Sequence, residues 1–198
     1  MAGKDPVKYR LEILGRDREI AYSDHGGNYF TGRLKNVIKM AAEKANWGKK
    51  MPKGQGMGFA AHVTFGTYVA QVAEVSVSQL GELKIHKITA VVDCGILVNR
   101  SGAEPQIQGA IIDGLSGVFG AEITIEKGRT KQSNFHEYLL LRIKDAPEIE
   151  VHFVESTEAP FGLGEMGIPP LAPAVCNAIF AATGKRIRKL PVKKEDLL

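Results

Sequence analysis

Apolar and polar positions repeat along the chain with two different periods, and each period predicts a different kind of element. In residues 32–45 the apolar side chains recur at helical spacing, which predicts an amphipathic helix. The apolar stripe of this helix consists of Leu34, Val37, Ile38, Ala41 and Ala45. A shorter helix is predicted for 5–14, because Asp5 can cap it, Pro6 suits a first helical position and Gly15 suits a helix end.

Three β-rich runs follow the second helix. They read "GMGFAAHVTF" (56–65), "TYVAQVAEVSVS" (67–78) and "ELKIHKITAVVD" (82–93). The last two runs are joined by the tight turn "QLGE", so the block predicts an antiparallel hairpin or a three-stranded meander. Further short strands are predicted near 121–126 and 148–155.

Helical spacing returns twice in the second half of the chain. Residues 104–120 repeat apolar side chains at helical spacing in spite of three internal glycines. A final helix is predicted to start around Pro173 and to end at Gly184. Residues 16–30 are polar and contain glycine, so a loop is predicted there.

Together these elements predict an α+β fold in which helices pack on a mostly antiparallel sheet. No internal repeat or low-complexity segment divides the chain of 198 residues. We therefore expect one domain over 1–198, with a helical N-terminal segment (1–50) and an α+β body (51–198).

The net charge is +4, and much of it comes from "GKRIRKLPVKK" near the C-terminus. A basic stretch can bind nucleic acid, but no aromatic residues are interleaved here, which favours a solvated tail. We expect no nucleic-acid partner. No apolar run reaches the roughly 18–20 residues that cross a bilayer, so membrane insertion is not expected. The first residues lack the apolar centre of a secretory signal. The compartment, cytoplasmic or periplasmic, stays open.

The cysteines and histidines do not form a metal-binding pattern. The two cysteines, Cys94 and Cys176, lie far apart, and the five histidines are scattered without the spacing of a zinc or iron site. We expect the chain to hold no metal through its own side chains.

Two short motifs have a structural and a functional interpretation. The glycines of "GQGMG" (54–58) could cradle a phosphate, but they precede a strand instead of following one, which favours a plain turn. Asp93, at the end of the third β-rich run, is either a turn former or a polar ligand contact, and the pattern favours the turn.

Gln106 and Gln108 fall at the predicted start of the helix at 104–120. Unpaired N–H groups at a helix start favour anionic ligands. Spacing alone favours two exposed glutamines without a ligand.

Glu165 is a single carboxylate among Gly162, Gly164 and Gly167, directly before a proline-rich apolar run. Glycines allow a backbone to approach a ligand closely, and the prolines stiffen the path into the last helix. If residues 168–175 enclosed the loop, desolvation would raise the carboxyl pKa toward that of a general base. The alternative is a surface loop acid or a helix-capping residue, and the residues alone favour neither.

Four long stretches resemble one family in the same order along the chain. They are "WGKKMPKGQGMGFAAHVTFGTYVAQVAEVSV", "AVVDCGILVNRSGAEPQIQGAIIDGLS", "QSNFHEYLLLRIKDAPEIEVHFVES" and "GLGEMGIPPLAPAVCNAIFAATGKRIRKLP". The family is that of the molybdenum hydroxylases related to xanthine dehydrogenase. The resemblance is greatest to large subunits of the isoquinoline 1-oxidoreductase and bacterial aldehyde dehydrogenase type.

The resemblance implies roles for particular residues. Glu165 matches the glutamate of the family's G-x-G-E motif, which is the catalytic base beside molybdenum, and Gly164 belongs to the same motif. Gln106 matches the glutamine of a Q-x-x-G-A element against the molybdenum–pterin site, and Gly109 and Ala110 complete that element. The implied reaction is hydroxylation of an aldehyde or N-heteroaromatic substrate, with water as the oxygen donor.

The resemblance also implies cofactors and partners. The expected cofactor is molybdopterin, in its cytosine dinucleotide form, carrying molybdenum and shared with an upstream chain or partner. Electrons would leave through iron–sulfur clusters on a [2Fe-2S] small subunit. Large subunits of the family are several times longer, so we expect the isolated chain to be inactive without the remainder of such a subunit. The alternative is a non-catalytic cofactor-binding or assembly module that keeps the fold.

Overall fold

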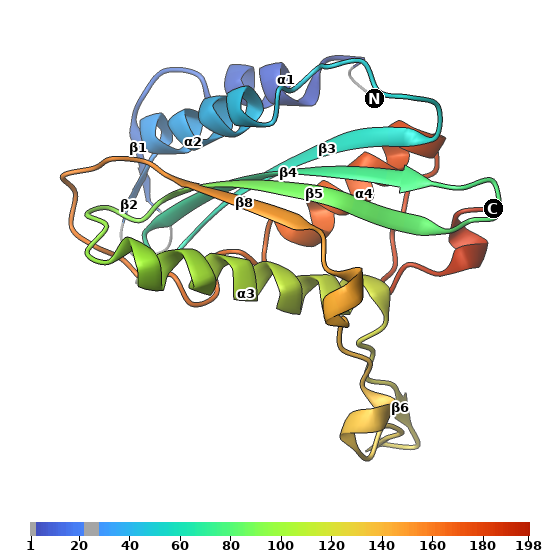
Figure 1. Ribbon diagram of the computed structural model, residues 1–198. Helices are drawn as coiled ribbons and strands as arrows, with labels where there is room; N and C mark the ends of the chain where they lie inside the picture. The colour runs from blue at the N-terminus through green and yellow to red at the C-terminus, as the bar shows by residue number, and fades with distance from the viewer. Residues whose placement is uncertain (1–2, 22–27) are drawn as a thin grey trace.

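The computed structural model describes residues 3–21 and 28–198, which form a sheet with helices on both faces and one projecting arm (Figure 1). The helices are α1 (Pro6–Leu14), α2 (Thr31–Lys44), α3 (Arg100–Phe119) and α4 (Leu171–Thr183). The long strands are β3 (Gln55–Thr64), β4 (Thr67–Val77), β5 (Leu83–Asp93) and β8 (Glu148–Phe153). Short elements are β1 (Glu19–Ala21), β2 (Asn28–Phe30), β6 (Ile125–Glu126), β7 (Arg129–Thr130) and the 3-10 helices Phe135–Glu137, Ile143–Asp145 and Lys194–Asp196.

The main sheet has the order β3-β4-β5-β8. Strands β3, β4 and β5 form the predicted antiparallel meander, which confirms that prediction. Strand β8 pairs in parallel with β5, so the sheet is mixed. A parallel neighbour requires a crossover, and α3 together with the projecting arm forms that connection.

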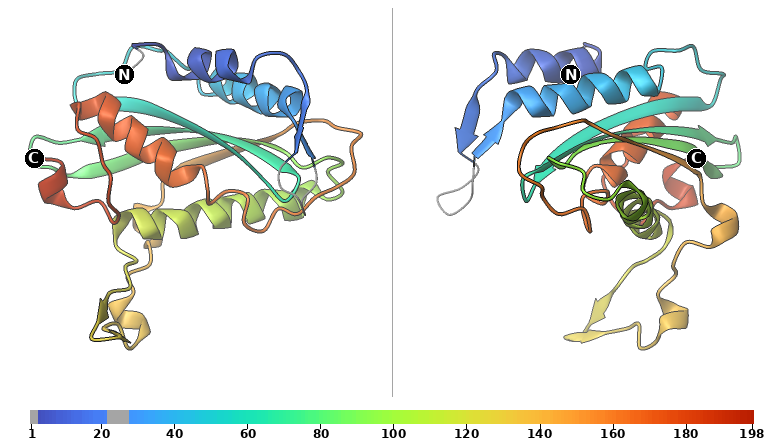
Figure 2. Two further views of the ribbon diagram at one scale, coloured as in Figure 1. Left: turned by 180° about the vertical axis from the view of Figure 1, so that it is seen from behind. Right: turned by 60° about the vertical axis from the view of Figure 1, so that its left-hand side comes forward.

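Strand β4 is buried on both faces, which explains its almost continuous apolar sequence. On one face Val69, Ala73 and Val75 belong to the core that α3 and α4 cover. On the other face Ala70 and Val72 belong to the core that α1 and α2 cover. Figure 2 shows these two layers from behind and from the side. The expectation of an α+β fold with helices packed on a mostly antiparallel sheet is confirmed.

Helix α4 lies very close to β3, and two glycines make this possible. A Cβ on Gly58 would lie 2.1 Å from the carbonyl oxygen of Ala174 and from the backbone nitrogen of Ala178. A Cβ on Gly56 would lie 2.5 Å from the carbonyl oxygen of Ala178. These glycines of "GQGMG" therefore serve helix–strand packing, while Gly54, with a φ of +78°, forms the predicted turn.

The first helix agrees with its prediction: the Asp5 side chain accepts a hydrogen bond from the Lys8 N–H at 2.8 Å, and Gly15 ends the helix. The loop predicted for 16–30 is confirmed for 16–18 and wrong for 19–21 and 28–30, where β1 and β2 pair as an antiparallel ribbon. Residues 22–27 lie outside the described residues. Strands of three residues are too short to show a period in the sequence, which explains the error.

Two helix boundaries also differ from the predictions. Helix α3 begins at Arg100, four residues before the predicted start, with Asn99 accepting a hydrogen bond from the Gly102 N–H. Pro105 lies inside this helix, whereas a proline in a sequence usually indicates a first helical position. Helix α4 begins at Leu171, two residues earlier than predicted. None of the helices in the described ranges has the length and apolar character that spanning a bilayer requires.

Candidate functional site

Helix α3 carries the first part of the predicted site. Gln106 and Gly109 are exposed on this helix, and Ala110 is buried. Because the helix begins at Arg100, Gln106 and Gln108 lie in its second and third turns, so the prediction that they sit at the helix start is wrong. Their side chains therefore do not share a ligand with the free N–H groups of a helix N-terminus.

The loop before α4 carries Glu165, and it packs against α3. Gly167 is buried, and a Cβ at that position would lie 3.0 Å from both the Cβ of Ala110 and the carbonyl oxygen of Ile107. Only a glycine fits such a contact without displacing the helix. The two predicted motifs, far apart in the sequence, thus meet where Gly167 touches the middle of α3.

Two buried polar side chains on β4 hold this loop at its two ends. The Thr67 hydroxyl donates a hydrogen bond to the carbonyl oxygen of Gly162 at 2.9 Å, and the Gln71 amide donates one to that of Gly167 at 2.8 Å. Both side chains are fully buried. Glu165 lies between the two anchored carbonyls, so β4 fixes the position of the loop.

Further contacts fix the path of the chain into this loop. A Cβ on Gly66 would lie 2.3 Å from the Phe161 ring, so the ring packs directly on the glycine backbone. The Phe161 N–H donates to the carbonyl oxygen of Cys94 at 2.8 Å. The roles of Thr67 and Gln71 were not predicted from the sequence. Their available signal was the occurrence of uncharged polar residues within an otherwise apolar strand.

Glu165 itself is exposed, so within the described residues the run 168–175 does not enclose its carboxylate. Pro170 and Leu171 turn inward and are buried in the core beneath the loop, and they leave the carboxylate at the surface. A turn follows Glu165, in which the Ile168 N–H donates to its carbonyl oxygen at 3.0 Å.

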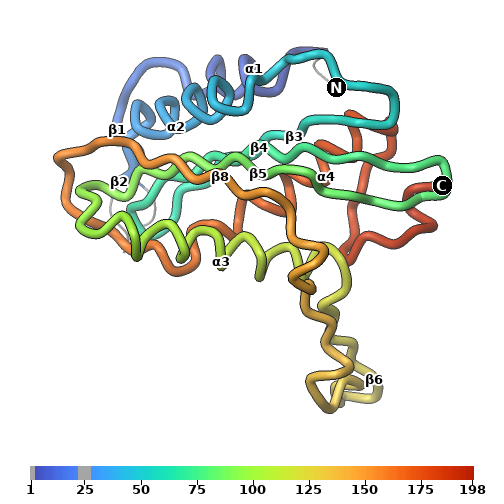
Figure 3. Tube along the Cα trace, in the orientation of Figure 1, coloured from blue at the N-terminus to red at the C-terminus, as the bar shows by residue number. Residues whose placement is uncertain are grey.

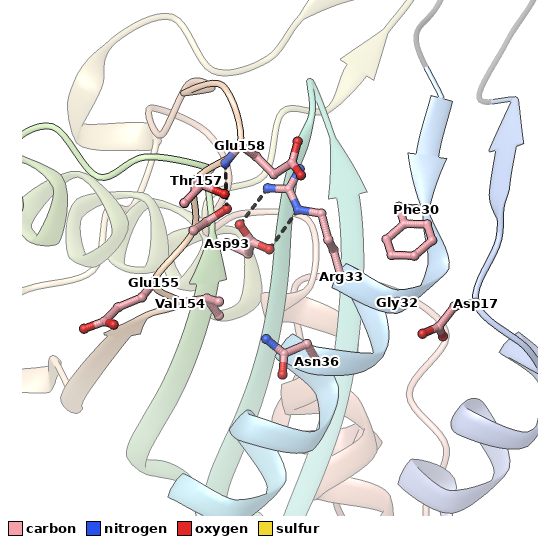
Figure 4. Close-up of a pocket in the computed structure, with 11 residues that line it drawn as sticks. Asp17, Phe30, Gly32, Arg33, Asn36, Asp93, Val154, Glu155, Thr157 and Glu158 are labelled. Carbon is pink, nitrogen blue, oxygen red and sulfur yellow. Dashed lines mark hydrogen bonds and ion pairs between the residues drawn. The ribbon is translucent and has the colours of Figure 1, made fainter.

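A separate cavity of about 640 Å³ lies between α2 and the chain that follows β8 (Figure 4). Arg33 and Asp93 form a two-bond ion pair at its centre, with N–O distances of 2.9 and 2.6 Å. The hydrogen bond that the Arg33 guanidinium donates to Asp93 raises the pKa of Arg33. Asp93 also accepts the Gly95 N–H, which is the turn-forming role favoured in the sequence analysis. Apart from Asp93, the candidate residues are absent from its lining: Gln106, Gly109, Ala110, Gly164 and Glu165 lie elsewhere.

Within residues 3–21 and 28–198, no cluster of three or more histidine, cysteine, aspartate or glutamate side chains could hold a metal ion. Cys94 is buried and Cys176 is partly buried, and burial raises the pKa of both thiols. His25 lies outside the described residues.

The predicted site residues fit one side of a large polar cofactor. Apart from the adjoining residues and the helix's own backbone, no heavy atom of the described residues lies within 4 Å of the position that a Cβ would take on Gly109 or Gly164, so the backbone is open at both places. An exposed amide (Gln106) and an exposed carboxylate (Glu165) belong to the same two segments. The Gln71 Oε1 atom is buried nearby without a hydrogen-bond partner among the described residues. Open backbone with amide and carboxylate groups suits a pterin, which carries several donors and acceptors.

Comparison with known families identifies the class of protein. Residues 14–147 match the model of the molybdopterin cofactor-binding domain, which includes Gln106, Gly109 and Ala110. The chain belongs to this family. Glu165 and Gly164 lie beyond the matched residues.

Two curated relatives match nearly the whole chain. A membrane-bound aldehyde dehydrogenase of Gluconacetobacter polyoxogenes, whose name also carries pyrroloquinoline quinone, is 40% identical over 98% of this chain and 26% of its own length. The isoquinoline 1-oxidoreductase subunit beta of Brevundimonas diminuta is 31% identical over 96% of this chain and 23% of its own length. The chain thus spans about a quarter of the length of these relatives.

Solved structures show the same fold. The aldehyde oxidoreductase of Desulfovibrio desulfuricans ATCC 27774 is 30% identical, with a TM-score of 0.56 over 66% of this chain and 15% of that one. The quinoline 2-oxidoreductase of Pseudomonas putida 86 has a TM-score of 0.61 at 22% identity over 66% of this chain and 18% of that one. The expected relation to molybdenum hydroxylases is therefore confirmed.

Proposed function

We propose that this chain forms one side of the molybdenum–pterin site of a hydroxylase that oxidises an aldehyde or an N-heteroaromatic compound. The observation that carries the proposal is the contact of Gly167 with Ala110 and Ile107, because it brings the Q-x-x-G-A and G-x-G-E segments together. The names of the relatives support an aldehyde or a nitrogen heterocycle as the substrate class.

Each predicted residue has a role in this proposal. Gln106 would hydrogen-bond the cofactor through its amide, while Gly109, Ala110 and Gly164 would let it approach the backbone. When bound, the cofactor would supply the redox chemistry and carry oxygen from water to the substrate. Glu165 would act as the general base, accepting a proton at its carboxylate, a role that typically contributes about 10²- to 10⁴-fold in rate.

The exposure of Glu165 supports a site that a second body of protein completes. A general base works in a cavity from which bulk water is excluded. In the proposed enzyme, the polypeptide that corresponds to the uncovered three-quarters of the relatives would cover the other side of the cofactor. A separate small subunit with [2Fe-2S] clusters would take the electrons, and the pterin would be the cytosine dinucleotide form.

Replacing Glu165 by glutamine in the assembled enzyme tests the base. The variant is expected to lose turnover by at least about 10²-fold while it keeps its molybdenum, because the amide cannot accept the proton. Glu43→Gln, an exposed change on α2, is the matched control and is expected to keep full activity. Turnover of Glu165→Gln at the unaltered rate would reject the base and favour the non-catalytic cofactor-binding or assembly module.

Metal analysis tests the need for a partner. The purified chain alone is expected to contain no stoichiometric molybdenum, since the described residues form only one open side of the site. Near-stoichiometric molybdenum in the isolated chain would overturn this part of the proposal. Pyrroloquinoline quinone in place of molybdopterin in the assembled enzyme would overturn the cofactor.

A further inference from the structure

An arm made of residues 121–140 projects from the body of the molecule (Figures 1 and 3). It leaves the C-terminal end of α3 and returns toward β8, so it interrupts the crossover between the two parallel strands. Among the strands in 3–21 and 28–198, β6 and β7 pair only with each other. The arm therefore has no sheet of the body to support it.

The arm exposes large apolar side chains. Phe135 is 90% exposed and Ile125 is 71% exposed. The other exposed apolar residues of the arm are Ile123, Tyr138, Leu139 and Leu140. A hollow of about 410 Å³ at the tip is lined in part by Ile123, Phe135 and Tyr138. Apolar surface concentrated on one projecting element, instead of scattered singly, marks an interaction site.

Polar side chains hold the arm in shape from within. The Gln132 Oε1 atom accepts the Thr124 N–H at 2.7 Å, and the Glu137 carboxylate accepts both the N–H and the hydroxyl of Ser133. The Ser133 backbone hydrogen bond lowers the pKa of Glu137, which keeps the carboxylate in its accepting form. An element that is already ordered loses little conformational entropy when it binds.

The charge of the arm favours an apolar protein partner. Its three basic residues, Lys127, Arg129 and Lys131, are balanced by three acidic ones (Glu122, Glu126 and Glu137). A net-neutral arm gains little from the phosphates of nucleic acid or from anionic lipid headgroups. Burial of apolar surface is therefore the main contribution to the free energy of binding that the arm can make.

The arm and the candidate site lie on the same side of the sheet. Gly167 packs on α3, and the arm extends beyond the C-terminal end of that helix in all views (Figures 1 and 2). A second polypeptide that covered Gln106 and Glu165 would extend along α3 toward the arm. The two relatives contain such additional mass, since this chain spans only 26% and 23% of their lengths.

We propose that the arm docks into an apolar groove of the polypeptide that corresponds to the uncovered part of the relatives, and so fixes that polypeptide over the open side of the site. The inference rests on the proposed function for the identity of the partner. It adds the surface that holds the partner in place, which is separate from the residues that would touch the cofactor.

A chimera tests the docking: this chain replaces its matching segment in the isoquinoline 1-oxidoreductase subunit beta of Brevundimonas diminuta. Phe135→Cys places a thiol on the arm, and Ile13→Cys places one on α1, across the sheet, where Ile13 is 56% exposed. Alkylation of Phe135→Cys is expected to be slowed at least about tenfold in the chimera relative to the isolated chain, and that of Ile13→Cys unchanged. The unsubstituted proteins give the background from Cys94 and Cys176.

Trypsin gives a second readout without any substitution. Lys127, Arg129 and Lys131 are exposed at the tip of the arm, so the isolated chain is expected to be cut there quickly. The same bonds are expected to be cut at least about tenfold more slowly in the chimera. An arm equally accessible in both proteins, equal protection of Ile13→Cys, or a chimera that fails to fold would overturn the proposal.

Other binding partners of the arm would give different results in the same experiments. Protection in the isolated chain that disappears on dilution would assign the arm to a second copy of this chain. Protection by phosphatidylcholine–phosphatidylglycerol vesicles without protection in the chimera would assign it to a membrane. Either result overturns the proposal. Molybdenum content is measured on the same chimera, so a protected arm without molybdenum keeps the docking surface and rejects the proposed function.

Discussion

Gln71 and Thr67 show how single buried polar residues can place a loop. They lie four positions apart on β4, so their side chains point to the same face of the sheet. Each donates to a carbonyl oxygen of the loop that carries Glu165. A buried donor must find an acceptor, and a buried carbonyl must find a donor. Each of the two hydrogen bonds therefore gives a buried donor of the strand an acceptor in the loop.

We predict that Gln71→Met lowers the free energy of unfolding by about 1–3 kcal/mol, because the buried Gly167 carbonyl loses its donor while the side-chain volume is nearly kept. Urea unfolding of the purified chain measures the change. Gln79→Met alters an exposed amide in the β4–β5 turn and should stay within about 0.5 kcal/mol of the unaltered chain. Equal stabilities of the two variants would show that the Gln71 bond does not support the loop.

At this scale the sequence predicted some roles and missed others. The positions of Glu165 and Gln106 came from motif resemblance, and their assignment stays a prediction. The sequence marks Gln71 only as an uncharged polar residue in an otherwise apolar strand, and such a residue usually indicates a solvent-facing position. The loop, which comes much later in the chain, supplies the acceptor that this buried side chain needs.

Among the elements, one lysine of β5 adds ion pairs to the backbone pairing of β5 with β8. Lys87 on β5 lies 2.8 Å from carboxylate oxygens of both Glu148 and Glu150. The hydrogen bond to Glu148, followed by that to Glu150, raises the pKa of Lys87, and the hydrogen bond from Lys87 lowers the pKa of Glu150. Parallel pairing is slightly weaker per residue than antiparallel pairing, so these ion pairs reinforce the weaker edge of the sheet.

The sign of the Glu150 pKa shift predicts an acid-dependent loss of stability. A carboxyl with a lowered pKa in the folded state stabilises the fold above its ordinary pKa of about 4.5 and loses that contribution as the pH falls through the folded pKa. Glu150 is partly exposed, so its contribution at pH 7 is about 0.5–1 kcal/mol. Urea unfolding of Glu150→Gln and the unaltered chain should differ by this amount at pH 7 and converge once the pH has fallen below the lowered pKa of Glu150 in the folded state.

Glu155→Gln, a change of an exposed carboxylate just after β8, is the control and should leave stability unchanged at both pH values. A Glu150→Gln difference that persisted at low pH would point to packing instead of charge.

Periodicity predicted the long elements well and the short ones badly. The meander and α2 follow from clear patterns. The start of α3 did not, because Pro105 in the sequence marks a helix start, whereas in the structure Asn99 caps an earlier turn. The ribbon of β1 and β2 depends on tertiary contacts such as the hydrogen bond from the Phe30 N–H to the Tyr68 hydroxyl.

For the molecule as a whole, the ion pair of Arg33 and Asp93 links the N-terminal helices to the sheet. Arg33 belongs to α2 and Asp93 ends β5, and the carboxylate is only 3% exposed. Val37, Ile38 and Ala41 of α2 pack on the same face of the sheet. The single-domain boundary of 1–198 stays a prediction, and this link gives a way to test it.

We predict that Arg33→Met lowers the free energy of unfolding by about 3–5 kcal/mol, since it leaves the buried Asp93 carboxylate without its partner. Adding Asp93→Asn should restore part of the loss, because no buried charge remains. Arg10→Met, at an exposed site on α1, is the control. Thermal unfolding of all variants should show one transition. A separate early transition for the N-terminal helices would contradict a single cooperative domain.

The close approach of the two ends of the arm at its base determines where the chain can accept inserted residues. The outgoing and returning parts of the arm meet there, since a Cβ on Gly120 would lie 3.4 Å from the Cβ of Leu139, and the Leu141 N–H donates to the Ser116 hydroxyl at 3.0 Å. Because these ends are already close, residues added at the Lys127–Gly128 turn would not pull on α3 or on β8. The tip of the arm is thus a position where the chain can accept an inserted tag or a longer hairpin while the sheet keeps its register.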